Sequence, residues 1–367
     1  MINNKTIAVV VSAYNEETQI GMVLESMPEF VDRIIVVNDH SNDLTQEIVR
    51  NYILNDPSVK KNIDKVKNHI EPNRYNHADI LTQRKHNEEI KSLTPCEVYN
   101  ENELSDRIIL INHKKNAGKG AAIATGFKWA RDHHIDCIAT MDGDGQMDPE
   151  ELQSICWPVI SEGIDYVKGN RLIHRSASEV IPATRFIGNS ILSILTKLAS
   201  GYWHVSDTQT GFTAISKHAL DAIQLHKIYK SYGYPNDLLV KLNIAYCTIK
   251  EVEIKPVYNL GEKSKMKIWK VIPRVSWLLL KSFYKRIWIR YFLRDFHPLF
   301  LLYNLSFILL FSSIPFLNKI LYHSIISNTP ANPVTVLAFI FLAISSFQSL
   351  LFAMWMDIQD NERLFKN

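Results

Sequence analysis

The chain has 367 residues, 22% of them charged, and a formal net charge of +3. This length allows two domains and a full α/β core, and the nearly neutral charge gives no indication of nucleic acid binding. The four cysteines, Cys96, Cys137, Cys156 and Cys247, include no Cys-x-x-Cys pair, which argues against a zinc site or a disulfide framework. The apolar run at residues 7–11 is only as long as a strand, so we expect no N-terminal signal peptide.

Four apolar runs, each followed by a polar turn, predict a parallel sheet. The runs are residues 7–12, 33–38, 108–112 and 136–141. Continuous apolar runs joined by helical segments are typical of strands that helices cover on both faces, so we predict an α/β fold. Ligands bind at the carboxyl ends of the strands in such folds, and the polar turns lie at those ends.

Residues 55–106 interrupt this alternation of strands and helices. The segment is polar, carries both signs of charge, and contains Pro57, Pro72 and Pro95. We predict an insertion on the surface without a catalytic role, and a lid over the site is the alternative.

The fourth apolar run leads into an acidic turn, DGDGQ at residues 142–146. Two carboxylates separated by one glycine at the end of a strand can direct their oxygens at a single hard cation, Mg²⁺ or Mn²⁺. Asp148, Pro149 and Glu151 then provide an N-cap, a first-turn proline and an acid, which predicts the start of a helix. A solvated acidic loop is the alternative for the turn taken alone.

Two long apolar segments follow the α/β part of the chain. Residues 296–318 and 334–356 contain no Asp, Glu, Lys or Arg. As a helix each would extend over roughly 34 Å, enough to cross a hydrocarbon core of about 30 Å, so we predict two membrane spans rather than buried soluble helices. The preceding segment, residues 263–295, is rich in cations and aromatic residues. It predicts an amphipathic helix, or a pair broken at Pro273, in the headgroup region; a basic helix packed on the soluble domain is the alternative.

The distribution of basic residues predicts the orientation in the membrane. Ten Lys or Arg lie between Lys263 and Arg294, whereas the loop at residues 319–333 holds one Lys and the tail at residues 357–367 is mixed. The positive-inside rule therefore places residues 1–262 and the tail in the cytoplasm. We expect a multi-pass protein of the cell membrane or of an ER-type membrane.

Seven motifs occur in the order found in one known family. They are SAYNEE at 12–17, NDHSND at 38–43, NAGKG at 116–120, DGDGQ at 142–146, GNR at 169–171, DTQTGF at 207–212 and GEKSK at 261–265. With these motifs the chain resembles a family 2 glycosyltransferase of the GT-A fold, in the dolichol-phosphate mannose synthase-like branch of polyprenyl-phosphate glycosyltransferases. The resemblance implies a Rossmann-like, mostly parallel sheet with helices on both faces, interfacial amphipathic helices and two C-terminal transmembrane helices.

The resemblance implies a site for a UDP- or GDP-linked nucleotide-sugar donor. The residues carried over for the donor are Ala13, Tyr14, Asn15, Glu16, Asp39, Gly118, Lys119, Asp142 and Gly143. A carboxylate such as Asp39 can accept hydrogen bonds from a base N–H or from ribose hydroxyls. The chain departs from the family pattern at Asn38, where many relatives have Asp, and at His40, where they have Gly. Ordinary turn residues are the alternative for this set.

The resemblance also implies a metal site, a catalytic set and an acceptor site. Mg²⁺ or Mn²⁺ would be held by Asp142, Asp144 and Gln146 and would bridge the donor diphosphate. The catalytic set is Asp144, Arg171, Arg185, Asp207 and Asp237. The acceptor phosphate would contact Arg171, Arg185, Lys263, Ser264 and Lys265. Relatives often carry an arginine near residues 258–261, and here Lys263 or Lys265 would take its role. A structural salt bridge is the alternative for the arginines, and helix capping for Asp207 and Asp237.

We therefore predict a membrane-anchored, metal-dependent, inverting enzyme that moves one sugar from a nucleotide-sugar to dolichyl or undecaprenyl phosphate. A phosphate nucleophile whose second pKa is about 6 is largely dianionic and needs little help from a general base. One alternative is a family 2 transferase that extends a lipid-linked glycan or polysaccharide, although no Gln-x-x-Arg-Trp motif is present. The other alternative is a catalytically inactive membrane scaffold. The sequence also allows a homo-oligomer.

Overall fold

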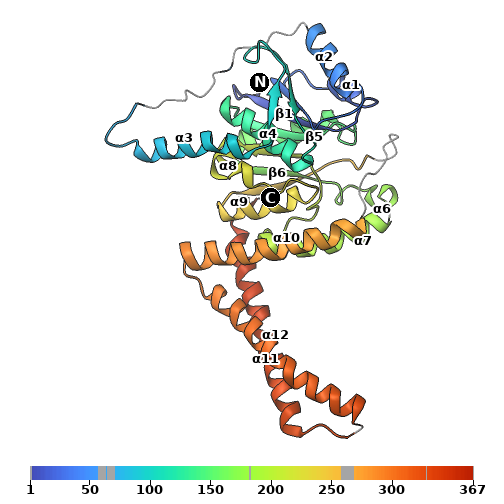
Figure 1. The fold of residues 1–367 in the computed structure, drawn as a ribbon, viewed down its shortest axis with the longest axis vertical. Coiled ribbons are helices and arrows are strands. Elements are labelled where there is room, and N and C mark those ends of the chain that lie inside the picture. The colour runs from blue at the N-terminus through green and yellow to red at the C-terminus, as the bar shows by residue number, and fades with distance from the viewer. Residues whose placement is uncertain are drawn as a thin grey trace.

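The computed structural model describes residues 2–56, 63, 71–181, 183–257, 268–327 and 329–366. Figure 1 shows an α/β part, a layer of helices beneath it, and a helical hairpin that extends from this layer. The described residues include a nine-stranded sheet in the order β3-β4-β2-β1-β5-β7-β6-β8-β9.

The four strands predicted from the apolar runs are present and parallel to one another. They are β1 (Ile7–Ala13), β2 (Arg33–Asn38), β4 (Ile108–His113) and β5 (Cys137–Asp142). Their bounds agree with the prediction to within one residue. The predicted fold class is confirmed, because helices cover this sheet on both faces.

The other strands extend the sheet at both ends. They are β3 (Cys96–Val98), β6 (Tyr166–Asn170), β7 (Thr213–Ser216), β8 (Ile249–Glu253) and β9 (Phe365–Lys366). β7 is antiparallel to β5 and β6, and β3 is antiparallel to β4. β3 belongs to the segment predicted as an insertion, so part of that segment forms an edge of the sheet.

Alternate residues of β1 face two separate hydrophobic clusters. Ala8 and Val10 belong to one cluster, and Val9 and Val11 belong to the other. The helices on the first face are α4 (Lys119–Asp132), α8 (Lys217–Ala222) and α9 (Tyr234–Ile244), and those on the second are α1 (Ile20–Glu25), α2 (Thr45–Asn55) and α5 (Leu152–Ser161). Because side chains of a strand alternate between its faces, burial of both faces requires the continuous apolar runs.

Further helices of differing length complete the described α/β part. They are α3 (His77–Glu89), α6 (Ala177–Val180), and the 3-10 turns η1 (Ile90–Ser92), η2 (Pro149–Glu151) and η3 (Leu225–Lys227). The helix start predicted at Asp148 is confirmed, because its side chain accepts a hydrogen bond from the Glu150 amide at 3.0 Å. This turn leads directly into α5 and fixes the end of the acidic loop.

A layer of helices lies beneath the sheet domain. α7 (Ala183–Ser200) packs against α10 (Ile268–Trp288), which continues as the π-helical turn η4 (Ile289–Arg294). α10 runs through Pro273 without a break, so the alternative of two helices separated at that proline is wrong. A third hydrophobic cluster, including Leu192 and Val275, joins this layer to the hairpin below it.

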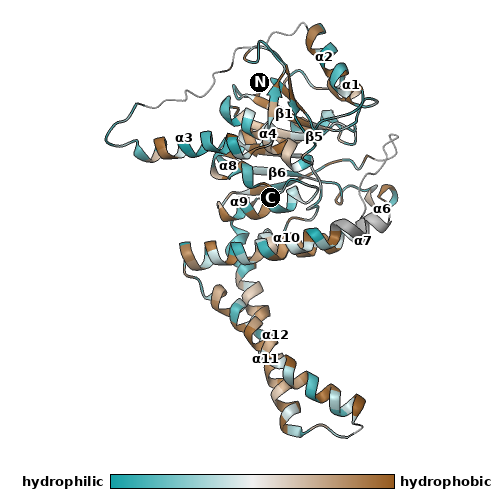
Figure 2. Ribbon diagram, viewed as in Figure 1, coloured by the Kyte–Doolittle hydropathy of each residue, from teal (hydrophilic) through white to brown (hydrophobic). Residues whose placement is uncertain are grey.

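The hairpin consists of two helices long and apolar enough to cross a membrane. They are α11 (Pro298–Leu321), which continues as η5 (Tyr322–Ile326), and α12 (Pro333–Glu362). Only 28% and 11% of their most apolar stretches are buried, unlike the core helix of a soluble domain. Figure 2 shows hydrophobic residues prevailing along both helices.

The C-terminal end of α12 is fixed to the helix layer by buried polar contacts. The Arg286 Nη1 and Nη2 atoms donate to the two carboxylate oxygens of Asp357 at 2.8 and 2.7 Å. Arg286 also donates to the carbonyls of Leu198 and Ala199 at 3.1 and 2.9 Å. The sequence placed the end of this helix at residue 356, whereas the structure continues it to Glu362 and then forms β9. The segment predicted as a tail therefore returns to the sheet domain.

Candidate functional site

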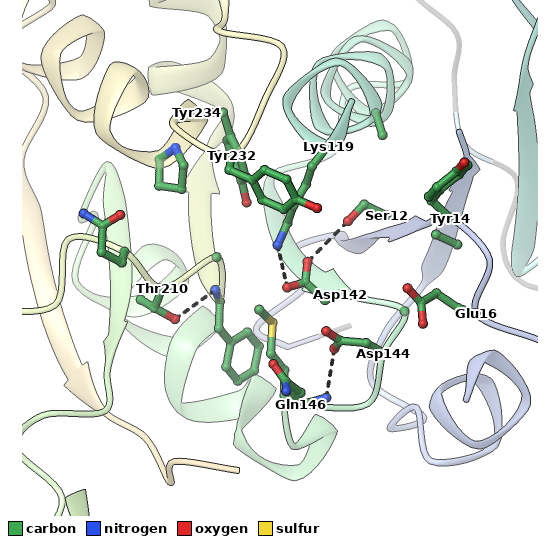
Figure 3. Close-up of a pocket in the computed structure, with 18 of the residues that line it drawn as sticks. Ser12, Tyr14, Glu16, Lys119, Asp142, Asp144, Gln146, Thr210, Tyr232 and Tyr234 are labelled. Atoms are coloured by element: carbon green, nitrogen blue, oxygen red, sulfur yellow. Dashed lines mark hydrogen bonds and ion pairs between the residues drawn. The ribbon is translucent and has the colours of Figure 1, made fainter. Parts of the chain in front are cut away.

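A cavity of about 1010 Å³ opens at the carboxyl edge of the sheet. All nine residues predicted to bind the donor line it, as do Asp144, Gln146 and Arg171. Figure 3 shows Glu16, Lys119 and Asp144 converging on Asp142 from the ends of β1 and β5 and from the start of α4. The convergence follows from the parallel strands, whose carboxyl ends meet at one edge.

Two of the residues that line this cavity, Lys119 and Asp142, form an ion pair. Asp142 ends β5 beside Ser12 of β1, and the Ser12 hydroxyl donates to its Oδ1 at 3.3 Å. The Lys119 ammonium donates to Asp142 Oδ2 at 2.6 Å, as Figure 3 shows. Gly118 has a φ of +94°, and a Cβ there would lie 2.5 Å from the carbonyl oxygen of Lys230. Only glycine fits that position, so the close backbone approach places Lys119 at the first turn of α4.

Asp144 lies beyond Asp142 on the same loop. Its Oδ1 accepts a hydrogen bond from the backbone amide of Gln146 at 3.0 Å. Desolvation by the surrounding protein raises the pKa of Asp144 to about 6, and the charge of Asp142 adds to this effect. Glu16 faces the same space in Figure 3 and also raises this pKa. The site thus gathers negative charge that a cation would stabilise.

The residues present fit a divalent cation that takes some of its ligands from the protein and the others from the substrate and water. In the described part of the chain, no three His, Cys, Asp or Glu side chains form a metal site by themselves. Mg²⁺ is commonly held by one or two carboxylates, with waters and substrate phosphates supplying the other oxygens. Asp142 and Asp144 match the one or two carboxylates that a protein commonly supplies to Mg²⁺. Gln146 lines the cavity next to them.

Asp39 organises the glycine-rich loop as well as lining the cavity. Its Oδ1 accepts from the Ala117 amide at 2.9 Å and its Oδ2 from the Gly118 amide at 2.7 Å. The ring of His113, at the end of β4, bonds Oδ1 through Nδ1 at 2.7 Å. Burial alone would raise the pKa of Asp39, but the hydrogen bonds from His113, Ala117 and Gly118 outweigh it and lower that pKa. Asp39 therefore stays ionised.

His113 holds Asp39 in place from outside the cavity lining, and the sequence analysis assigned it no role. It is fully buried, and its Nε2 lies 2.9 Å from the hydroxyl of Thr125 on α4. The predicted strand ended at residue 112, one position before it. A polar residue that ends a buried apolar run was the available signal, because such a residue needs a polar partner.

The two departures from the family pattern have structural consequences. His40 has a φ of +62°, a left-handed conformation that suits glycine better than other residues. Asn38 is buried, donates to the Asn112 side chain at 2.9 Å and accepts from the Ser41 amide at 3.0 Å. An asparagine makes both contacts because it carries a donor and an acceptor, whereas an ionised aspartate only accepts.

Arg171 and Asp207 form a two-point ion pair at the wall of the cavity. The Arg171 Nε donates to Asp207 Oδ2 at 2.8 Å and its Nη2 to Oδ1 at 3.1 Å. Burial would raise the pKa of Asp207, but the Arg171 guanidinium lowers it overall. Arg171 lines the cavity, and the buried Asp207 supports it from behind.

The remaining predicted residues are not brought to this cavity by described contacts. Asp237 accepts from the Tyr229 amide at 2.8 Å and pairs with Lys241, and it is not among the residues that line the cavity. The backbone of Arg185 belongs to α7, but its side chain lies outside the described residues, as do Lys263, Ser264 and Lys265.

The cavity reaches the helix layer at its other end. There it is lined by Asn189 and Leu192 of α7 and by Ile272 and Val275 of α10. Gln209, Tyr232 and Tyr234 also line the cavity, and the sequence analysis assigned no role to them. Figure 3 shows Tyr232 and Tyr234 beside Lys119. One cavity therefore joins a carboxylate-rich edge of the sheet to an apolar helix layer.

Comparison with known proteins agrees with this geometry. The model of the family described as Glycosyl transferase family 2 matches residues 8–68 and 90–224. The UDP-N-acetylglucosamine–dolichyl-phosphate N-acetylglucosaminyltransferase of Methanococcus voltae is 29% identical over 257 residues, which are 70% of this chain and 87% of that protein. The undecaprenyl-phosphate mannosyltransferase of Micrococcus luteus is 29% identical over 150 residues, 41% of this chain and 60% of that protein.

A solved structure is similar at a lower level. Glucosyl-3-phosphoglycerate synthase from Mycobacterium tuberculosis, in complex with Mn²⁺, uridine diphosphate and glucosyl-3-phosphoglycerate, matches 77% of this chain and 80% of that chain. The TM-score is 0.46 and the sequence identity 16%. This likeness is too weak to carry an argument about the site.

Proposed function

Because the chain belongs to glycosyl transferase family 2, we propose that it transfers one sugar from a nucleotide-sugar to a polyprenyl phosphate at a membrane. The observation that carries the proposal is the single cavity that runs from Asp142 and Lys119 to Leu192 and Val275. A water-soluble donor and the head of a lipid acceptor can meet inside it. The names of the relatives in Methanococcus voltae and Micrococcus luteus support this acceptor class.

The donor end of the cavity neutralises a diphosphate. The Lys119 ammonium, anchored at the first turn of α4, offers hydrogen bonds to phosphate oxygens. When bound at Asp142 and Asp144, Mg²⁺ or Mn²⁺ supplies positive charge that stabilises the leaving nucleoside diphosphate. Asp39 holds the glycine-rich loop in place, so these groups are positioned before the substrate arrives.

The acceptor end positions a phosphate nucleophile. Arg171, fixed by Asp207, would orient the phosphate, and Arg185, Lys263, Ser264 and Lys265 are proposed to assist it. A phosphate oxygen forms a bond to the anomeric carbon as the bond from that carbon to the diphosphate oxygen breaks. The electron pair leaves with the diphosphate, and the anomeric configuration inverts. No side chain has to remove a proton, because the acceptor is largely dianionic at neutral pH.

The helix layer and the hairpin provide the membrane attachment in this proposal. Trp277 is 58% exposed on α10, and Trp288 and Phe292 follow it on the outer surface. Lys281 lies 5.2 Å from the ring of Trp277. Aromatic rings next to cations favour the interface between headgroups and hydrocarbon. α11 and α12 would then cross the bilayer, with the sheet domain on the cytoplasmic side.

The test is a transfer assay with the purified full chain in detergent. The reaction contains Mg²⁺ or Mn²⁺, a short polyprenyl phosphate, and one member at a time of a panel of UDP- and GDP-sugars. We expect one donor to give a lipid-phosphate sugar, with product lost on addition of EDTA and restored by excess metal. A donor that binds but gives no lipid product would refute the acceptor assignment and direct attention to glycan hydroxyls. Absence of donor binding would refute glycosyl transfer.

A further inference from the structure

The loop at residues 206–212 lines the cavity with its residues 209–212 and is anchored from within the protein. The Asp207 carboxylate accepts from the backbone amides of Gln209 and Thr210, both at 3.2 Å. Lys168 of β6 is fully buried, and its ammonium donates to the carbonyl of Thr210 at 2.6 Å. A charged donor and a charged acceptor thus hold two neighbouring residues, which makes this wall rigid.

Hydrogen bonds beneath this loop fix the orientation of one side-chain amide. The Ser193 hydroxyl donates to the carbonyl of Ser206 at 3.0 Å, which uses its only hydrogen. The Thr208 hydroxyl, 3.0 Å from Ser193 Oγ, must therefore be the donor in that pair. Thr208 Oγ1 then has only lone pairs left for Gln209, at 2.8 Å. Gln209 must present its NH₂ group, and not its carbonyl, to Thr208.

The same NH₂ group has a second buried partner. Gln209 Nε2 donates to Asn236 Oδ1 at 3.1 Å, so both of its hydrogens are used. Thr208 and Asn236 are buried, whereas Gln209 is partly exposed and lines the cavity. The nitrogen therefore points into the protein. Among the described residues no hydrogen bond involves Gln209 Oε1, which leaves this oxygen for a ligand.

An amide oxygen in this place selects among the groups of the substrates. It accepts hydrogen bonds and donates none, so it offers nothing to a phosphate dianion. A sugar carries hydroxyl donors, and an acetamido sugar also carries an N–H. Two residues along the loop, a methyl group added to Gly211 would lie 3.5 Å from Lys119 Nζ. The loop is thus adjacent to the site assigned to the diphosphate, to which the sugar is attached.

We infer that Gln209 recognises the sugar being transferred, through a hydrogen bond from a sugar hydroxyl or acetamido N–H to Gln209 Oε1. The inference rests on the proposed function and deepens it, because it names a residue that determines donor specificity. A donor that lacks the contacted group leaves this oxygen unpaired in a partly buried place, which disfavours it.

The experiment compares donors with and without the sugar. Gln209→Met in the full chain keeps the length of the side chain and removes the oxygen. Isothermal titration in detergent with Mn²⁺ uses UDP-N-acetylglucosamine, UDP-glucose and GDP-mannose, and then UDP and GDP alone. We expect affinity for the preferred nucleotide-sugar to fall about tenfold, and affinity for its nucleoside diphosphate to stay within about twofold. Gln153→Met, at an exposed position of α5, is the matched control.

A second comparison separates recognition from a merely structural role. Donors in which one sugar hydroxyl is replaced by hydrogen are titrated into the wild type and into Gln209→Met. Removal of the contacted group should weaken binding to the wild type but not to the variant, which is the coupling expected of a direct contact. Equal weakening of nucleotide-sugar and nucleoside diphosphate would overturn the inference, as would no weakening at all.

These outcomes are distinct from failure of the proposed function. If the wild type binds nucleotide-sugars but does not glycosylate polyprenyl phosphate, the acceptor assignment fails and the Gln209 comparison still decides the inference. If the wild type binds no nucleotide-sugar, both are overturned together.

Discussion

Two ion pairs in this molecule each join a cationic side chain to an aspartate, but they differ in their exposure to solvent. Lys119 and Asp142 meet at 2.6 Å in the cavity, where their side chains are 26% and 18% exposed. Arg286 and Asp357 meet at 2.7 Å in the helix layer, where both are fully buried. A partly exposed pair can exchange its partners for a metal ion or a phosphate at small cost. A buried pair cannot separate, because each charge would lose its compensation without gaining water.

Breaking the buried pair should have the largest effect on stability. In Asp357→Asn the Arg286 guanidinium stays buried without its counter-charge, so we expect a loss of about 3–5 kcal/mol in the free energy of unfolding. Denaturant unfolding in detergent measures it. Arg363→Gln is the matched control, because Arg363 is 60% exposed in its pair with Asp360, and it should cost less than about 1 kcal/mol. Similar small losses in both variants would contradict the comparison.

Removing a carboxylate from the cavity should affect catalysis instead of stability. For Asp144→Asn we expect kcat to fall by about a hundredfold to a thousandfold, since charge stabilisation of the leaving group is lost. The melting temperature should not fall, because desolvation and the charge of Asp142 already disfavour the ionised form. Steady-state transfer kinetics and a thermal melt test the two parts. Full activity in this variant would refute the assigned metal site.

Breaking the exposed pair should weaken donor binding by a smaller factor. Lys119→Met removes a charged donor from the diphosphate site, so we expect nucleotide-sugar affinity to fall about ten- to a hundredfold. The free energy of unfolding should change by less than about 1 kcal/mol, since the pair is partly solvated. Titration and denaturant unfolding supply both values. A stability loss as large as that of Asp357→Asn would show that this pair is structural.

The smallest effect on binding is expected at Thr208, which contacts Gln209 but does not line the cavity. Thr208→Val keeps Gln209 but removes the hydroxyl that fixes its amide. We expect nucleotide-sugar affinity to fall about two- to threefold with nucleoside diphosphate affinity unchanged, because a neutral hydrogen bond is lost only indirectly. Titration with both ligands checks this. A larger loss of affinity than in Gln209→Met would contradict the proposal that Thr208 acts only by orienting Gln209.

The sheet was predictable where both faces of a strand are buried. β1, β2, β4 and β5 are continuous apolar runs, so local sequence determines them. β8 has the sequence Ile-Lys-Glu-Val-Glu, and β9 contains only Phe365 and Lys366. Neither has a strong local signal, since their pairing depends on contacts between distant segments.

The site was predictable to the extent that it is built from loops at strand ends. Asp39, Lys119, Asp142 and Asp144 reach one cavity because parallel strands bring their turns together. The role of Gln209 was not predictable from its motif. Its orientation depends on Ser193 and on Asn236, which lies 27 positions away in the chain. Hydrogen-bond directions of this kind exist only in the folded state.

The ninth strand makes the catalytic part of the chain discontinuous in sequence. β9 pairs with β8, yet it follows both apolar helices of the hairpin. During synthesis the sheet therefore gains this strand only after α11 and α12 have been made. A fragment that ends at residue 262 would leave Ile249 and Lys250 of β8 without their strand partner, and unpaired amides and carbonyls at a sheet edge invite aggregation. A soluble form of the enzyme should accordingly retain residues 357–366, joined by a linker in place of the hairpin.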